Sequence, residues 1–468
     1  MRYVFEKLQM KKMKNHLSGL NQRSAKFMFR GISIPWFMKR SYRNITTTAP
    51  MTQAIDYTSW SKEDLIAKIS ELEQKTAPTT SPTCTAPKPE IRQKSKKQKQ
   101  FDWSRHNFRF IALRFAYLGW NYNGLAYQFE PTPLPTVEET ILKTLSKIKL
   151  IPEPIDQVDF SRCGRTDKGV SAMNQVVSIK LRSNLSPEEQ QDSTNDDKEI
   201  DYLTIINANL PSDIKVHSIC LHPPPDFDAR FSCKNRHYRY LFKASNLDIE
   251  AMNKAAGYYQ GQHDFRNFCK LDGSKQITNF ERFIYSSKII HLENDLFCFD
   301  LIGTAFLWHQ VRCMVAILFL VGQHLEKPEI VTDLMDITKY PTKPQYEMAN
   351  DIPLVLYDCE FPPMDWKQFD NEYKFNRIMN GFKGMCYDLN IRTKMSSIME
   401  DLVFKDQPKA TAPAINTVPL GDGVGRSFAK YTPLENRERT DSYEIINARW
   451  MAKKEGKRNT TKEVQIDE

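Results

Sequence analysis

The stretch FSRCGRTDKGV at residues 160–170 says the most about the fold and chemistry of this 468-residue chain. Gly164 and Gly169 bracket Arg-Thr-Asp-Lys directly ahead of a strand-like segment. Because glycine permits positive φ and a close approach of the backbone to a ligand, we expect a tight polar loop at the edge of a strand. Asp167 stands among three basic side chains, which favours an ionised carboxylate that can act as a nucleophile or base. An ordinary salt-bridged turn is the alternative.

The segments around this loop predict an α+β body that begins near residue 107 and ends near Trp366. Strands outnumber helices, and they alternate as antiparallel strands with one wetter face do. The sequence TVEE at 136–139 predicts a capping box that opens a helix. The expected strands lie at 109–118, 177–181, 237–243 and 297–303.

Two further stretches carry candidate functional residues. Tyr238 and Tyr240 share one face of an expected strand with basic residues around them, which suits stacking on a nucleobase, although paired tyrosines in a sheet are more often core residues. In the stretch 304–321, the expected helix is apolar on nearly every side past Trp308 and yet contains Arg312. A buried unpaired charge costs several kcal/mol, so Arg312 needs an acidic partner, and Asp167 is the candidate.

Composition limits the function classes. Residues 1–50 hold 11 Lys and Arg and one acid, so of the total charge of +9 the remaining chain carries −1. Any nucleic-acid site must therefore be a local basic patch. No apolar run approaches the roughly 18 residues that span a bilayer, so we expect no membrane segment.

The cysteines and the short motifs point away from bound cofactors. The nine cysteines are scattered without a C-x-x-C pair, which indicates free thiols in a reducing compartment and gives no spacing typical of a metal site. The common phosphate-binding, dinucleotide-binding, zinc-protease and serine-hydrolase motifs are absent from the sequence. We expect an enzyme, if it is one, to work without metal or cofactor.

The chain is expected to divide into five parts. The first part, residues 1–50, resembles a mitochondrial transit peptide. The alternative is an unstructured extension ahead of a second start at Met51. A polar, acidic surface insertion is expected at 184–200, and a helix at 440–454. The parts are a basic extension (1–50), a short helix at 61–75 with a Pro/Thr-rich and basic linker (51–106), two catalytic halves (107–220 and 221–370), and a mostly disordered extension (371–468).

Taken together, these segments resemble the TruA family of tRNA pseudouridine synthases. The similarity covers about 109–361, with several motifs in the family's order. The motifs are GRTDKGV at 164–170, NANLPSDI at 207–214, ARFS at 229–232, RHYRY at 236–240 and FLWHQVRCMV at 306–315. GLAYQ at 124–128, PLVLYD at 353–358 and the 61–75 helix with its basic linker resemble the eukaryotic branch that modifies uridines 38 and 39 of the anticodon stem-loop.

The resemblance implies the pseudouridine synthase fold: two α+β halves whose antiparallel sheets join, with a catalytic cleft between them. It implies that Asp167 is the nucleophile that breaks the glycosidic bond, leaving open whether it attacks C1′, attacks the base or promotes a glycal. Tyr238 would stack on the uracil and act as a base, and Arg312 would pair with Asp167. The implied contacts to the flipped nucleotide and the RNA come from Tyr238, Arg165, Lys168 and Arg230.

The resemblance also implies tRNA as partner, a homodimer, and no metal or cofactor. We expect the protein in the nucleus and cytoplasm, with a mitochondrial form if the N-terminal extension is a transit peptide. Two alternatives stand beside the 38/39 synthase: a sister synthase acting on other tRNA or mRNA uridines, and a non-catalytic RNA chaperone with a relic site. The intact Gly-Arg-Thr-Asp loop at 164–167 argues against the chaperone.

Overall fold

The computed structural model describes Lys68 and residues 101–155, 158–405 and 417–464, with side chains to residue 456. The chain divides into two compact units, 1–96 and 97–468, and the elements below all belong to the second. The expected extension at 1–50, the helix at 61–75 and the basic linker lie outside the described residues, apart from Lys68, which is helical.

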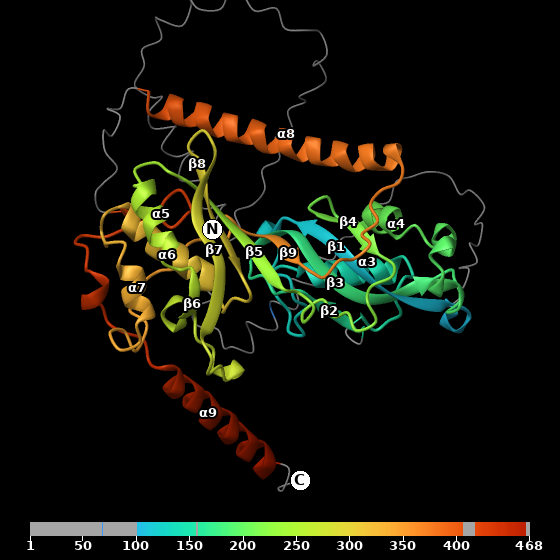
Figure 1. Cartoon of the computed structure of the whole chain (residues 1–468), viewed down its shortest axis with the longest axis horizontal. Coiled ribbons are helices and arrows are strands. Elements are labelled where there is room, and N and C mark those ends of the chain that lie inside the picture. Colours follow the sequence, from blue (N-terminus) through green and yellow to red (C-terminus); the bar gives the residue numbers. More distant parts are fainter. Residues whose placement is uncertain (1–67, 69–100, 156–157, 406–416, 465–468) are drawn as a thin grey trace, which may run out of the picture. The chain divides into compact units, whose positions relative to one another are not determined.

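A nine-stranded sheet forms the centre of the described chain (Figure 1). Its strands pair in the order β4-β1-β3-β9-β5-β8-β7-β6, and β2 pairs with β3 outside this path. Every pairing is antiparallel except that of β3 with β9. The strands are β1 (Asn107–Tyr117), β2 (Phe160–Arg162), β3 (Ser171–Ser183), β4 (Ile214–Cys220), β5 (Asn235–Lys243), β6 (Gly261–Asp264), β7 (Glu281–Glu293), β8 (Leu296–Gly303) and β9 (Leu354–Glu360).

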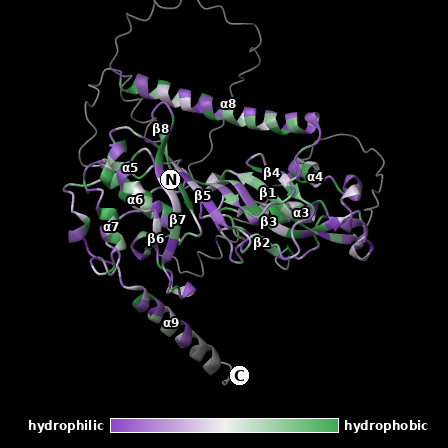
Figure 2. Ribbon diagram, in the orientation of Figure 1, coloured by the Kyte–Doolittle hydropathy of each residue, from purple (hydrophilic) through white to green (hydrophobic). Residues whose placement is uncertain are grey.

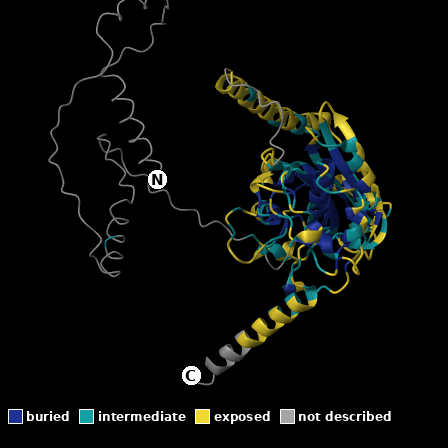
Figure 3. Cartoon of the chain, turned by 90° about the vertical axis from the view of Figure 1, so that its left-hand side faces the viewer, coloured by how far each residue is buried: buried dark blue, intermediate teal, exposed yellow. Residues whose placement is uncertain are grey.

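The sheet consists of two halves that β9 joins. Strands β1 to β4 belong to the N-terminal half and β5 to β8 to the C-terminal half, and β9 lies between β3 and β5. Each half has its own buried apolar cluster, and Tyr238 packs against both. Figure 2 shows hydrophobic residues gathered along the strands, and Figure 3 shows the same region buried. The expected α+β class with two joined antiparallel sheets is confirmed.

The helices that cover these clusters follow from their sequences. In α3 (Val137–Lys147), Thr136 accepts a hydrogen bond from the Glu139 amide at 3.2 Å and its own amide donates to the Glu139 carboxylate, so the predicted capping box is present. Helix α6 (Gln310–Gly322) is buried at every residue except Arg312, as its apolar sequence predicts. The others in these halves are α4 (Tyr202–Asn209), α5 (Ile249–Gly257) and α7 (Ile330–Met335).

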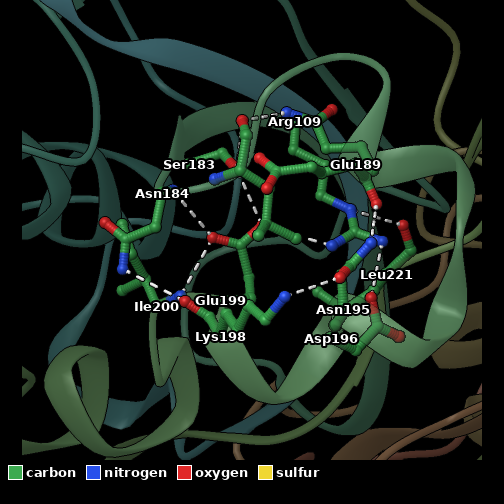
Figure 4. A network of polar contacts seen from close by, with 12 residues as sticks. Arg109, Ser183, Asn184, Glu189, Asn195, Asp196, Lys198, Glu199, Ile200 and Leu221 are labelled. Carbon is green, nitrogen blue, oxygen red and sulfur yellow. Dashed lines mark hydrogen bonds and ion pairs between the residues drawn. The ribbon is translucent and has the colours of Figure 1, made fainter.

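We expected the stretch 184–200 to be a polar, acidic surface insertion, but two of its acidic side chains are buried. Arg109 of β1 is buried and forms ion pairs with Asp196 at 3.0 Å and with Glu199 at 3.2 Å (Figure 4). Both carboxylates are also buried, and Lys367 pairs with Asp196 at 2.7 Å. The sequence shows a run of polar residues, but it does not show that a basic strand residue 80 or more positions away neutralises two of them.

The C-terminal part also differs from the mostly disordered extension that we expected at 371–468. Helix α8 (Glu372–Val403) runs for 32 residues without a buried side chain (Figures 1 and 3). Beyond it, Leu434 is fully buried in the C-terminal cluster, and the Tyr431 hydroxyl donates to Glu326 at 2.6 Å. Isolated apolar anchors such as Leu434 have no periodicity that a sequence pattern could reveal. The remaining elements are β10 (Thr417–Val418), β11 (Arg426–Ser427) and α9 (Tyr443–Val464), which overlaps the helix predicted at 440–454.

Among the described helices, none has both the length and the apolar character that crossing a membrane requires. The 32-residue α8 carries charges along its whole length.

Candidate active site

Asp167 lies in the loop between β2 and β3, next to the start of β3, an interior strand of the sheet. Its neighbour Thr166 is buried and shares a 2.7 Å hydrogen bond with the Tyr117 hydroxyl. The Thr166 carbonyl accepts from the Leu125 amide at 3.1 Å, and the Gln175 side chain donates to the loop backbone at 3.0 Å. These bonds tie the loop to β1, to the 119–128 segment and to β3, so the predicted tight polar loop is present.

Two glycines let other segments approach this loop. Gly124 has φ +88°, and a Cβ there would lie 2.8 Å from the Thr166 carbonyl oxygen. Gly169 has φ +79°, and a Cβ there would lie 2.8 Å from the Asp351 carboxyl group. A side chain at either position would therefore combine left-handed backbone strain with a steric conflict.

The Asp167 carboxylate projects toward the segment that precedes α6. Trp308 Nε1 donates a hydrogen bond to Asp167 Oδ1 at 3.1 Å. His309 Nε2 lies 3.5 Å from Asp167 Oδ2. Burial, together with the positive charges of Arg312, Lys270 and Lys343, lowers the pKa of His309 to about 4, so its ring is neutral at neutral pH. The indole N–H of Trp308 therefore orients the Asp167 carboxylate, and the neutral His309 ring lies next to it. The Asp167 side chain is 32% exposed.

The pKa of Asp167 is raised above its ordinary value. Burial is the largest cause, and the nearby Asp351 carboxylate adds to it, while the Trp308 hydrogen bond and the charges of Arg312 and Lys270 oppose it. The three basic residues flanking Asp167 in sequence were expected to favour the ionised form. The structure shows that desolvation outweighs the surrounding positive charge.

Arg312 does not form the ion pair with Asp167 that we predicted. Among the described residues no ion pair joins these two side chains, and Arg312 Nε instead donates to the Ala349 carbonyl at 2.7 Å. Arg312 still lowers the pKa of Asp167 through its charge. The prediction failed because a main-chain oxygen, which sequence does not reveal, accepts from the guanidinium.

Asp167 lies on the wall of a cavity of about 710 Å³. The wall contains residues from both halves of the sheet, and its Lys and Arg side chains outnumber its Asp side chains by five to three. The charged lining residues are Arg165, Asp167, Lys168, Lys270, Asp272, Lys275, Arg312 and Asp351. A polyanion is thus met by a local excess of positive charge on a chain that is otherwise nearly neutral beyond residue 50.

Tyr238 of β5 provides an aromatic wall of this cavity. It is half-buried, and its ring meets Phe306 edge to face at a centroid distance of 5.0 Å. Burial raises the pKa of the Tyr238 hydroxyl, and the charges of nearby groups, including Asp167, add to this. Tyr240 is fully buried and donates to the Leu420 carbonyl, so of the two tyrosines only Tyr238 faces the cavity.

The other predicted site residues divide between the cavity and the surface. Arg165 and Lys168 are exposed on the cavity wall, and within the described chain no hydrogen bond or ion pair holds either side chain. Arg230 is exposed outside this wall, with its guanidinium 5.3 Å from the Phe231 ring. The structure therefore brings Asp167, Tyr238, Arg312, Arg165 and Lys168 together and leaves Arg230 apart.

Sequence reasoning did not single out Trp308, His309 or Lys270 as individual site residues. The first two stand inside the quoted FLWHQVRCMV motif, whose position before a buried helix was the available signal. Lys270 has no such signal, and it reaches the site because its amide donates to the Trp308 carbonyl and its ammonium group lies 4.9 Å from the Trp308 ring centroid.

Comparison with known proteins agrees with this geometry. Residues 255–362 match the family model described as tRNA pseudouridine synthase. The chain is 53% identical over 413 residues to a Saccharomyces cerevisiae protein, covering 86% of this chain and 93% of that protein. The chain belongs to the tRNA pseudouridine synthase family, in its TruA-type branch.

The names of the relatives are more specific. The S. cerevisiae protein is named tRNA pseudouridine(38/39) synthase, as is a Bos taurus protein that is 41% identical over 395 residues, covering 79% of this chain and 81% of its own. A Methanosarcina mazei protein named tRNA pseudouridine synthase A is 32% identical over 302 residues, covering 63% of this chain and 99% of its own.

Proposed function

We propose that this protein isomerises uridine to pseudouridine at positions 38 and 39 of the tRNA anticodon stem-loop. The observation that carries the proposal is that the Asp167 carboxylate and the Tyr238 ring line one cavity that has an excess of basic side chains. The relatives named tRNA pseudouridine(38/39) synthase, one matched over 93% of its length, support the choice of substrate and position.

The reaction begins with a uridine that leaves the base stack and enters the cavity. Removing a base from the stack costs a few kcal/mol, which contacts to the extruded nucleotide must offset. The half-buried Tyr238 ring provides a stacking face, and the unrestrained Arg165 side chain fills the space that the base leaves. The exposed Lys168 and Lys270 side chains on the cavity wall bind phosphates of the RNA.

Asp167 then acts as the nucleophile that breaks the bond between N1 of uracil and C1′ of the ribose. Its carboxylate bonds to C1′ as the N1–C1′ bond breaks, and uracil leaves as an anion. The uracil turns, C5 bonds to C1′ and releases the Asp167 carboxylate, and the proton on C5 is then removed while N1 gains a proton. The Tyr238 hydroxyl, which its raised pKa keeps protonated, relays this proton by giving its own proton to N1 as it accepts the one from C5. Trp308 supports the first step because its indole N–H orients the carboxylate and favours its ionised form.

Two accompanying proposals concern assembly and location. We propose a homodimer, which the resemblance to TruA-type enzymes supports and which light scattering of the purified protein tests. We also propose that the protein works in the nucleus and cytoplasm. The basic, acid-poor sequence of residues 1–50 supports an additional mitochondrial form, and expressing fluorescent fusions that start at Met1 and at Met51 tests it.

The experiment that tests the function maps pseudouridine at single-nucleotide resolution in unmodified tRNA incubated with the purified full chain. We expect product at positions 38 and 39. Product confined to other tRNA or mRNA uridines would replace the 38/39 assignment by a sister synthase. Tight tRNA binding without any product would instead favour an RNA chaperone with a relic site.

A further inference from the structure

Three cysteines that lie far apart in the sequence meet in the interior of the protein. Cys163 follows β2, Cys233 precedes β5, and Cys359 lies in β9. All three are buried, and their Sγ atoms lie within 4.8 Å of one another. Within the described residues this is the one group of three or more Cys, His, Asp or Glu side chains close enough to share a metal ion.

A cation without a carboxylate partner lies beside these thiols. The guanidinium of Arg236 donates to the carbonyls of Cys163 at 2.9 Å and Thr304 at 2.7 Å, and it also lies 3.5 Å from the Cys233 carbonyl. It is half-buried, and no ion pair in the described part of the chain involves it. A partly buried guanidinium without a carboxylate partner is stabilised by a nearby negative charge.

Three buried thiols that converge in this way differ from a single buried cysteine. A lone buried cysteine behaves as a small apolar side chain with a raised pKa. Cys298 of β8 is an example, because burial raises the pKa of its thiol to about 11.

We propose that Cys163, Cys233 and Cys359 bind a zinc ion as three thiolates beside Arg236. Three thiolates, one Zn²⁺ and one guanidinium sum to zero charge, whereas Cu⁺ in the same place leaves a buried net negative charge. Zinc–sulfur bonds of about 2.3 Å place tetrahedral sulfurs about 3.8 Å apart, so these sulfurs need to converge by at most about 1 Å. The Asn235 carbonyl, 3.2 Å from Cys233 Sγ, is an oxygen donor available for the fourth position.

The three ligands come from segments that position the active site. Cys163 begins the loop that contains Asp167, and Cys233 leads into the strand that contains Tyr238. Cys359 belongs to β9, which joins the two halves of the sheet. The ion therefore cross-links the two halves and fixes the base of the Asp167 loop, a structural role that does not depend on the proposed reaction.

The first test measures metal content in the full-length protein purified with reductant and without chelator. We expect about one zinc ion per chain by plasma mass spectrometry. We expect a loss to below about a tenth of that in Cys163→Ser, Cys233→Ser and Cys359→Ser, because two thiolates bind far more weakly. Cys298→Ser is the matched control, a buried cysteine outside the group, and it should keep its zinc. Copper in place of zinc would overturn the charge argument.

The second test keeps the proposal falsifiable if the serine variants do not fold. Wild-type protein stripped by a chelator is titrated with Co²⁺ and then with Zn²⁺. We expect thiolate-to-cobalt charge-transfer bands that saturate at one equivalent, zinc displacing the cobalt, and a higher melting temperature in the zinc form. Wild-type protein that contains no metal, shows no such bands and has the same melting temperature with and without Zn²⁺ would show the cysteines to be ordinary core residues.

Discussion

Replacing Arg109 by Ala removes the positive charge that neutralises two buried carboxylates. The side chains of Arg109 and Asp196 are each 3% exposed, and that of Glu199 is 2% exposed. Breaking such a pair by removing one partner costs about 3–5 kcal/mol of unfolding free energy, because the remaining charge stays buried without compensation.

The structure places the cost of this substitution at the lower end of that range. Asp196 keeps Lys367 at 2.7 Å. Glu199 keeps three neutral donors, the Ser183 hydroxyl at 2.7 Å and the amides of Asn184 and Ile200 at 3.0 and 2.9 Å. We therefore expect a loss of about 3 kcal/mol. For a folded body of this size that corresponds to a melting temperature lower by about 4 °C.

The assay is thermal and urea unfolding of the wild type, Arg109→Ala and the control Arg105→Ala. Arg105 pairs with Asp102 at 3.0 Å, but its side chain is 82% exposed, so the control should change the unfolding free energy by less than about 0.5 kcal/mol. Equal effects of the two substitutions would refute the reasoning, since they would show that the burial of the Arg109 network does not matter.

The same network predicts a pH dependence with a definite sign. Burial raises the pKa values of Asp196 and Glu199, but their hydrogen bonds, including those from Arg109, outweigh it and leave both pKa values below their ordinary range. Carboxylates with depressed pKa values stabilise the fold above their unfolded pKa of about 4, and this stability is lost as the pH falls through the folded pKa. The difference in unfolding free energy between wild type and Arg109→Ala should therefore narrow as the pH falls below about 4, through the folded pKa values of the two carboxylates. A difference independent of pH would contradict the assignment of these carboxylates.

Three further substitutions test the active site. Trp308→Phe removes the hydrogen bond that lowers the pKa of Asp167, so the acid limb of the pH profile of kcat/KM should move to higher pH, and an unchanged limb would refute this role. Asp351→Asn removes a negative charge that raises the same pKa, so the limb should move to lower pH, and a shift in the other direction would contradict the electrostatic account. Gly169→Ala should lower the unfolding free energy by about 1–3 kcal/mol because of its positive φ and the nearby Asp351 carboxyl; equal stability in urea unfolding would show that the loop relaxes without strain.

The parts of the fold that sequence predicted are those with a repeating pattern. Alternation placed β1, β3, β5 and β8, and the capping box placed α3, because each pattern is local and the buried face repeats along it. The parallel pairing of β3 with β9 and the anchoring of Leu434 could not be predicted in this way, since both depend on contacts between distant segments.

The candidate site likewise contains residues that a local sequence motif predicts and residues that only contacts between distant segments bring together. Asp167, Arg165 and Lys168 lie within one loop, so a glycine-bracketed motif was enough to place them together. The partner of Arg312 was predicted wrongly, because the main-chain oxygen of Ala349 gives no signal in the sequence. Lys270 was missed, and the convergence of three distant cysteines was invisible, because only the folded chain brings these side chains together.

The measurement that tests the central claim most directly is single-turnover pseudouridine formation with wild type, Asp167→Asn and the surface control Asp226→Asn. The asparagine keeps an oxygen that can accept from Trp308 but cannot act as a nucleophile, so we predict at least about 10⁴-fold slower product formation at positions 38 and 39. We expect tRNA affinity to stay within about threefold of the wild-type value, and the control to react at the wild-type rate. Turnover by Asp167→Asn within about tenfold of the wild type would contradict the assignment of Asp167 as the nucleophile.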